Sequence, residues 1–108
     1  MLAFCAYYQG TVKGSEAEFD TYVKDIHMPL VAKYPHLQQL RFLKGVGRDG
    51  NPPMYYLSFE LFFNNWEEFE IAKASAERDV AVQDAAYLAS LFEGQITHTV
   101  YEVNDIPV

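Results

Sequence analysis

Hydrophobic positions along the chain follow two periodicities, one typical of strands and the other typical of helices. The first segment, residues 2–8, is short and rich in apolar and aromatic side chains, which predicts a strand. Ser15 and Glu18 then have the spacing of a capping box, so a helix is expected to begin there. The helix should end by Tyr34, because the residue before a proline disfavours the α conformation. Its apolar stripe comprises Phe19, Tyr22, Val23, Ile26, Leu30 and Val31.

The middle of the chain predicts a β-hairpin with a long loop. Residues 37–44 and 54–62 are two apolar-rich runs, and in the first run Leu40 and Phe42 alternate with polar residues. The stretch GVGRDGNPP between the runs, at 45–53, is dense in turn-forming residues. A glycine-rich stretch can also bind a dinucleotide, but such a site requires a helix directly after the glycines. We therefore interpret residues 45–53 as a hairpin turn.

The last part of the chain predicts a long helical region and a final strand. Asn64 or Asn65 caps the helix, and the acidic residues of its first turn suit the positive end of the helix dipole. A break is expected near residues 74–76, which divides the region into two pieces. Gly94 is expected to end the helix, and residues 95–103 to form the fourth strand.

The predicted order is β-α-β-β-α-β, the arrangement of ferredoxin-like α+β folds. It implies a four-stranded antiparallel sheet with the helices on one face, and a length of 108 residues fits a single domain over 1–108. Both registers of the third strand carry large apolar groups, so the bare face of the sheet would expose an apolar patch in a monomer. We expect a homodimer that packs two such faces together, and further association of dimers stays open.

The composition narrows the classes of partner. The net charge of -7 argues against a nucleic-acid partner, because phosphate binding depends on an excess of Lys and Arg, and against adsorption to an anionic membrane. The single cysteine, Cys5, cannot form an intramolecular disulfide. The apolar N-terminal stretch is too short to span a membrane and lacks the basic residues of a signal peptide, so we expect a cytoplasmic protein. The classes of partner that remain are small apolar metabolites and other proteins.

The stretch from His27 to Pro29, near the end of the first helix, is the main candidate for chemistry. His27 lies four residues after Val23 and three before Leu30, at the edge of the apolar stripe, so its side chain is expected to face the sheet at least in part. Pro29 cannot donate the helical hydrogen bond to the carbonyl of Asp25 and should loosen that turn, which leaves room for a ligand. Imidazole suits proton transfer at neutral pH. The alternative is a histidine that only complements the negative end of the helix dipole.

Other polar residues offer further candidates. Tyr22, on the same helix as His27, is a candidate for hydrogen bonding to a ligand, although buried tyrosines commonly belong to a core. His98 lies in the fourth strand, either as a core or interface histidine or as a ligand contact. His36 is expected to be a solvated turn residue, and Cys5 a small buried apolar residue. The histidines lack the spacing of metal ligands, so no metal site is expected.

The first helix also carries a family resemblance. The segment EFDTYVKDIHMPLVAKYP, at 18–35, resembles the corresponding stretch of the EthD-domain family, in which an aromatic-bearing helix carries a His-x-Pro element and leads into a proline-containing turn. The histidine of that element falls on His27 and the proline on Pro29. The resemblance implies a dimeric α+β barrel, in which the sheets of two ferredoxin-like subunits face each other. Relatives in this superfamily include small isomerases, cyclases and cofactor-free or haem-handling monooxygenases, and the EthD group is associated with catabolic gene sets.

Together the patterns and the resemblance favour a cofactor-free isomerase or lyase acting on a small aromatic or lactone-type metabolite. His27 would be its acid and base, and the substrate-binding residues would be Tyr22, Pro29 and His98. Such an enzyme removes or returns a proton on a carbon next to a carbonyl group. Two alternatives stay open. One is a binding protein that sequesters the metabolite without chemistry, and the other is a monooxygenase that works without a cofactor or handles haem, with His27 or His98 as axial ligand.

Overall fold

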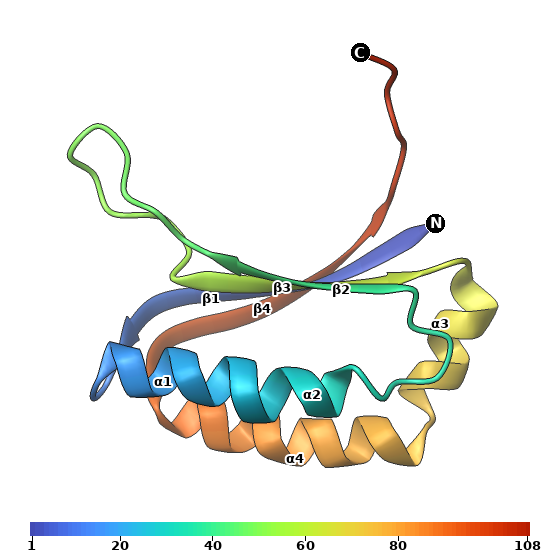
Figure 1. Ribbon diagram of the computed structural model, residues 1–108, viewed down its shortest axis with the longest axis horizontal. Coiled ribbons are helices and arrows are strands. Elements are labelled where there is room, and N and C mark those ends of the chain that lie inside the picture. The colour runs from blue at the N-terminus through green and yellow to red at the C-terminus, as the bar shows by residue number, and fades with distance from the viewer.

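The computed structural model describes residues 1–108 as a four-stranded antiparallel sheet with helices on one face (Figure 1). Its elements are β1 (Leu2–Val12), α1 (Glu16–Tyr22), the π-helical turn η1 (Val23–His27), α2 (Met28–Val31), β2 (Gln39–Lys44), β3 (Leu57–Phe63), α3 (Trp66–Lys73), α4 (Ala76–Ser90) and β4 (Phe92–Glu102). The strands are ordered β2-β3-β1-β4, and each neighbouring pair is antiparallel. The predicted ferredoxin-like α+β fold is confirmed. In detail, β1 extends beyond the predicted end at Tyr8, and β3 begins at Leu57 instead of Met54.

Capping residues begin the helices close to where the sequence predicts them. Ser15 Oγ accepts a hydrogen bond of 3.2 Å from the backbone N–H of Glu18, which begins α1. Asn65, the second of the two candidate asparagines, begins α3 in the same way, and Ser75 begins α4. The Ser75 cap lies inside the predicted break, so the division of the second helical region into two helices is confirmed.

A π-helical turn decides which side chains of the first helical region face the sheet. At the end of η1 the backbone N–H of Met28 donates to the carbonyl of Val23, five residues earlier, whereas an α-helix joins residues four apart. The wider turn changes the register of the side chains within η1, whereas Leu30 and Val31 after it still pack on the core. The predicted stripe is therefore wrong at Ile26, which is 46% exposed, while His27 is only 4% exposed.

Two glycines allow β1 and β4 to run side by side at close range. Gly94, with a φ of 144°, pairs across the strands with Gly10, whose φ is 148°. A Cβ on Gly94 would lie 2.1 Å from the carbonyl oxygen of Gln9, a distance that no side chain tolerates. The prediction that Gly94 ends the second helical region is wrong, because α4 ends at Ser90, β4 begins at Phe92 and Gly94 lies within the strand.

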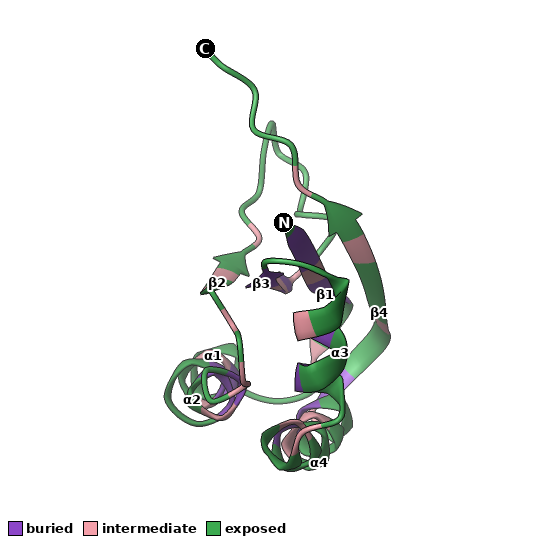
Figure 2. Ribbon diagram, turned by 90° about the vertical axis from the view of Figure 1, so that its right-hand side faces the viewer, coloured by how far each residue is buried: buried purple, intermediate pink, exposed green.

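The helices bury one face of the sheet, and the core lies between the two layers (Figure 2). The line of α1, η1 and α2 runs beside α4, while α3 lies at one end of the sheet (Figure 1). Aromatic rings fill much of this core, and four of them pack on one another: Tyr8, Phe19, Phe59 and Phe92. None of the helices combines the length and the apolar character that a membrane crossing requires.

The opposite face of the sheet carries no helix. A small buried cluster of Ala3, Cys5 and Phe62 lies on it, and the hydroxyl groups of Tyr7 and Tyr101 lie 2.8 Å apart there. Polar side chains are interspersed between these groups: Arg41, Ser58, Glu60, Thr97 and Thr99. The loop between β2 and β3 and the segment that follows β4 both extend on this side of the sheet, away from the helices (Figure 1). This face is therefore framed by two projecting segments.

Replacing Gly94 with alanine should lower the free energy of unfolding by at least about 2 kcal/mol, because the new Cβ meets the neighbouring strand at a φ that suits only glycine. Urea unfolding followed by circular dichroism measures the change. Gly14→Ala is the matched control, since a Cβ at Gly14 meets no atom within 4 Å. Equal stability of the two variants would contradict the close pairing of β1 and β4.

Candidate functional site

A cavity of about 350 Å³ opens between the sheet and the helices α2, α3 and α4. This volume lies within the range of about 300–1,000 Å³ that is typical of small-molecule sites. Aromatic and aliphatic side chains from both layers make most of its wall. Polar groups reach it from six residues: Tyr8, His27, Tyr34, Lys73, Arg78 and His98.

His27 enters this cavity as one half of a buried pair. Its Nδ1 lies 2.8 Å from Oδ2 of Asp84, a residue of α4. A carboxylate can only accept, so Nδ1 carries the proton and donates it to Asp84. The remaining nitrogen, Nε2, is then an unprotonated acceptor in the neutral ring. The π turn directs the imidazole toward the sheet, and Asp84 holds its tautomer and its orientation.

Tyr22 contacts the same carboxylate and does not line the cavity. Its hydroxyl donates a hydrogen bond to Oδ1 of Asp84, and this bond is the main reason why the pKa of Tyr22 rises to about 12. The ring also packs on Tyr87 of α4, with centroids 5.2 Å apart. Tyr22 therefore orients Asp84, and through it His27, whereas the sequence suggested a direct ligand contact.

Pro29 and His98 differ in their relation to the cavity. Pro29 follows the π turn, where its missing N–H leaves the carbonyl of Asp25 without an α-helical partner, and its side chain is exposed and outside the cavity wall. His98 lines the cavity and stacks on Phe4 with centroids 5.4 Å apart. Burial lowers the pKa of His98, and the positive charge of Arg78 lowers it further.

The two remaining candidates from the sequence lie elsewhere. His36 is exposed in the turn before β2, and its Nδ1 is 3.8 Å from the Glu68 carboxylate. Cys5 is buried on the sheet face that no helix covers, and burial together with the charge of Glu60 raises the pKa of its thiol. Neither side chain reaches the cavity.

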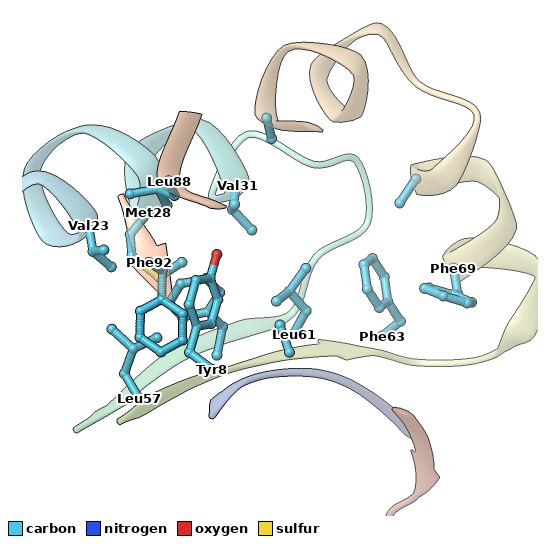
Figure 3. Packing of buried hydrophobic residues seen from close by; sticks show 14 of the residues in the cluster. Tyr8, Val23, Met28, Val31, Leu57, Leu61, Phe63, Phe69, Leu88 and Phe92 are labelled. Carbon is cyan, nitrogen blue, oxygen red and sulfur yellow. The ribbon is translucent and has the colours of Figure 1, made fainter. Parts of the chain in front are cut away.

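Tyr8 is a site residue that the sequence did not single out. It is 2% exposed, and no hydrogen bond within the protein engages its hydroxyl group. Figure 3 shows the hydroxyl raised from the sheet toward the helices, and Tyr8 lines the cavity together with Val31 and Leu61. Burial raises the pKa of Tyr8 to about 12, and the charge of nearby Asp84 adds to the rise. The phenol is therefore protonated at neutral pH and presents an unused donor to the cavity.

A shared aromatic neighbour brings Tyr8 and His27 to the same part of the cavity. The Phe59 ring lies 5.4 Å from the Tyr8 ring and 5.6 Å from the imidazole, between centroids. The signal that could have identified Tyr8 is its register, because it shares the helix-facing side of β1 with Leu2 and Ala6. The site therefore combines a basic nitrogen with a phenolic donor in an apolar enclosure.

Comparisons with known proteins assign the chain to a family. The family model described as the EthD domain matches residues 13–91. An uncharacterised 11.0 kDa protein from the thcB-thcC intergenic region of Rhodococcus erythropolis is 36% identical over 74 residues, which cover 68% of this chain and 72% of that protein. The family is thus supported both by the model and by a sequence relative.

Solved structures agree on the fold. An EthD family protein from Bacillus halodurans superposes with a TM-score of 0.82 at 23% identity, covering 96% of this chain and 99% of the other. SnoaB, a cofactor-independent oxygenase from Streptomyces nogalater, gives a TM-score of 0.66 at 19% identity, with 97% and 94% coverage. A dimeric ferredoxin-like protein of unknown function from Thermobifida fusca gives 0.68 at 14% identity, with 94% and 90% coverage.

His98 should titrate with a midpoint below the ordinary value of 6.5, because burial and Arg78 disfavour its charged form. The folded state then binds this proton more weakly than the unfolded state, so the contribution of His98 to stability falls as the pH drops through 6.5 toward the folded pKa. Titration of the histidine ring signals by NMR measures the midpoint. Arg78→Met should move it upward, and a midpoint at or above 6.5 in the native protein would contradict this placement.

Proposed function

The chain belongs to the EthD domain family, and on that premise we propose that it is an enzyme that moves a proton on a small ring-bearing metabolite. The observation that carries the proposal is the buried His27–Asp84 pair at the wall of an apolar cavity. A histidine whose tautomer is held by a carboxylate is the common form of a general base in enzymes. The apolar wall favours an aromatic or lactone-type substrate.

The proposed reaction needs no group beyond those of the chain. Nε2 of His27 takes a proton from a carbon next to a carbonyl group, and the electron pair of the C–H bond moves onto the carbonyl oxygen as an enolate. Asp84 stabilises the imidazolium that forms. Where a C=C bond is conjugated with the enolate, the imidazolium returns the proton to the γ-carbon of this dienolate, which shifts the double bond, regenerates the carbonyl group and completes an isomerisation. Loss of a leaving group from the enolate instead gives a lyase reaction.

Tyr8 has the properties of a donor to the enolate oxygen. Its hydroxyl is protonated at neutral pH, is free of protein partners and lies beside the same Phe59 ring as His27. A hydrogen bond from a preorganised donor is worth about 3 kcal/mol when charge develops on an oxygen in a water-poor site. Tyr22 would act indirectly, by orienting Asp84, because it hydrogen-bonds that carboxylate and does not line the cavity.

Hydrogen–deuterium exchange on a probe ketone tests this function. 1-Tetralone, a two-ring ketone, exchanges the hydrogens next to its carbonyl in D2O, and NMR follows the loss of their signal. His27→Gln should lower the protein-catalysed rate about 100-fold or more, since general acid–base catalysis contributes at least this much. Tyr8→Phe should lower the rate by a similar factor. Asp84→Asn should also lower it, because the amide no longer favours the required tautomer.

His36→Gln is the matched control, because it removes a histidine that lies outside the cavity. Its rate should equal that of the native protein. A rate for His27→Gln within tenfold of the native rate would rule out His27 as the general base. A different result would be exchange that persists in His27→Gln but is lost in Tyr8→Phe. That result would identify Tyr8, and not His27, as the residue that takes the proton.

A cofactor-free oxygenase is a second candidate, and the structural likeness to SnoaB favours it. The first step would be the same, because a carbanion formed by deprotonation is the species that reacts with O2 without a cofactor. Oxygen uptake measured with an electrode, alongside the exchange assay, separates the two reactions. A protein that binds ring compounds but catalyses neither reaction would be a binding protein.

We further propose that two chains associate through the sheet faces that no helix covers. The mixed apolar and polar character of this face suits an interface, and the two projecting segments beside it carry exposed apolar side chains: Val46, Met54 and Ile106. The structural neighbour from Thermobifida fusca is described as dimeric. The cavity lies on the other side of the sheet, so each chain would keep its own site.

Light scattering coupled to size-exclusion chromatography should give the mass of a dimer. Tyr101→Arg and Leu43→Arg each place a charge on an exposed position of the uncovered face, and both should shift the protein toward a monomer. Val80→Arg, at an exposed position on α4, is the control and should stay dimeric. Dimers in all three variants would place the interface elsewhere.

A further inference from the structure

Charged residues are distributed unevenly between the cavity and the rest of the chain. The sequence has 15 acidic residues against eight Lys and Arg, yet the cavity wall includes Lys73 and Arg78 and no Asp or Glu. Asp84 stands behind His27 and is outside the wall. In a chain with a net charge of -7, this cavity is a local exception that favours an anion.

The two cations differ in whether the protein already pairs them. Nζ of Lys73 lies 3.4 Å from the Glu70 carboxylate, so Lys73 already forms an ion pair within α3. No ion pair and no side-chain hydrogen bond engages the guanidinium of Arg78, although this residue is half-buried. A guanidinium carries five N–H donors in a planar fork that matches the two oxygens of a carboxylate. Arg78 is therefore the cation that is free to bind a ligand.

Arg78 belongs to a cavity wall that is partly open to solvent. Four other wall residues, Trp66, Lys73, Val82 and His98, are exposed, and Trp66 has 55% of its surface accessible. Arg78 lines the cavity together with Tyr34 and His98, and its charge lowers the pKa of His98 and opposes the burial-driven rise in the pKa of Tyr34. An anion bound here would keep part of its hydration, which limits the cost of removing it from water.

Asp84, the partner of His27, and the unpaired cation Arg78 lie on the same helix, α4. Arg78 and Asp84 are six residues apart on α4, which corresponds to about 9 Å along the helix axis. Ala81 and Ala85, whose side chains are small, line the cavity along the same helix. They leave room for a flat ring between the positive charge of Arg78 and the imidazole of His27.

We propose that the cavity binds a ring compound that carries a carboxylate, with the carboxylate on Arg78 and the reacting ring carbon beside His27. The assignment of the reacting carbon rests on the function proposed above, whereas the carboxylate contact rests on the cavity and its charges alone. Two parallel N–H···O bonds from Arg78 would fix the orientation of the acid, and the aromatic wall would enclose its rings. The substrate class is thereby narrowed to ring-bearing carboxylic acids.

Calorimetric titration with two matched probes tests the carboxylate contact. 2-Naphthoate carries the charge, and 2-naphthamide has the same rings and nearly the same shape without it. The native protein should bind 2-naphthoate at least tenfold more tightly than 2-naphthamide, since a hydrogen bond to a charged group changes affinity by about tenfold to 100-fold. Trp66 is the only tryptophan, so a shift of its single indole N–H signal in NMR spectra reports that a probe occupies the cavity.

Three variants identify the cation. Arg78→Met keeps the aliphatic stem and should remove the preference for 2-naphthoate while the affinity for 2-naphthamide stays the same, which also shows that the cavity is folded. Arg78→Lys should restore part of the preference. Arg48→Met removes the same charge from a loop side chain that is 91% exposed, and it should leave both affinities unchanged.

The outcomes separate this inference from the proposed function. Unchanged binding of 2-naphthoate to Arg78→Met, or equal affinities of the native protein for the two probes, would overturn the carboxylate contact and leave the acid–base role of His27 intact. Failure of the native protein to bind either probe at millimolar concentration would count against both proposals. Slow exchange in the ketone assay combined with Arg78-dependent binding of 2-naphthoate would support this inference alone.

Discussion

The contact between His27 and Asp84 is the interaction on which the candidate site depends. It joins two segments that are 57 positions apart in the chain, and His27 belongs to a π turn in which its own side chain is buried while that of Ile26 is exposed. Buried carboxylates are costly unless each oxygen is hydrogen-bonded. Here Oδ2 of Asp84 accepts a hydrogen bond from His27, and Oδ1 accepts one from Tyr22. These bonds offset the cost of removing the carboxylate from water, and the first of them holds the imidazole in one tautomer. Wider turns of this kind recur at functional sites because they redirect a side chain without ending the helix.

The cavity follows from how the two layers meet. The sheet supplies a continuous aromatic surface, while the helices above it leave space where α4 presents alanines. In a close-packed interior such a space is an exception. The polar groups that reach it differ in chemistry: a basic nitrogen, a free phenol and a free guanidinium. This combination suits recognition and reaction of one small molecule better than it suits a packed core.

The sheet has two faces with different surroundings. One face forms the core and the cavity, and the other carries mixed side chains framed by two projecting segments. The alternation of side chains along a strand makes this division possible, because neighbouring residues such as Tyr7 and Tyr8 point to opposite faces. Tyr7 pairs with Tyr101 on the uncovered face, while Tyr8 reaches the cavity. A single strand thus serves both the proposed interface and the proposed site.

Much of the fold could be predicted from the sequence because its signals are local. Helix caps at Ser15 and Asn65 and the alternating patterns of the strands depend on residues a few positions apart, and these predictions agree with the structure. His27 was also a candidate from the sequence, through its neighbouring proline and the family resemblance, and the structure places it at the cavity wall. The exceptions among the elements, Ile26 and Gly94, depend on a changed helical register and on the close approach of another strand. Neither is visible in a local pattern.

The partners of His27 could not be predicted in the same way. Tyr8 lies on β1, whereas Asp84 and Arg78 lie on α4, and each resembles an ordinary helix-surface or core residue when seen in its own segment. Their roles depend on distance, burial and the lack of other partners, and these properties arise only when the helices pack on the sheet. The sequence by itself therefore determined the order of the elements and the candidate histidine. The tertiary structure decided what surrounds that histidine, because hydrogen bonds and electrostatic fields act through space and not along the chain.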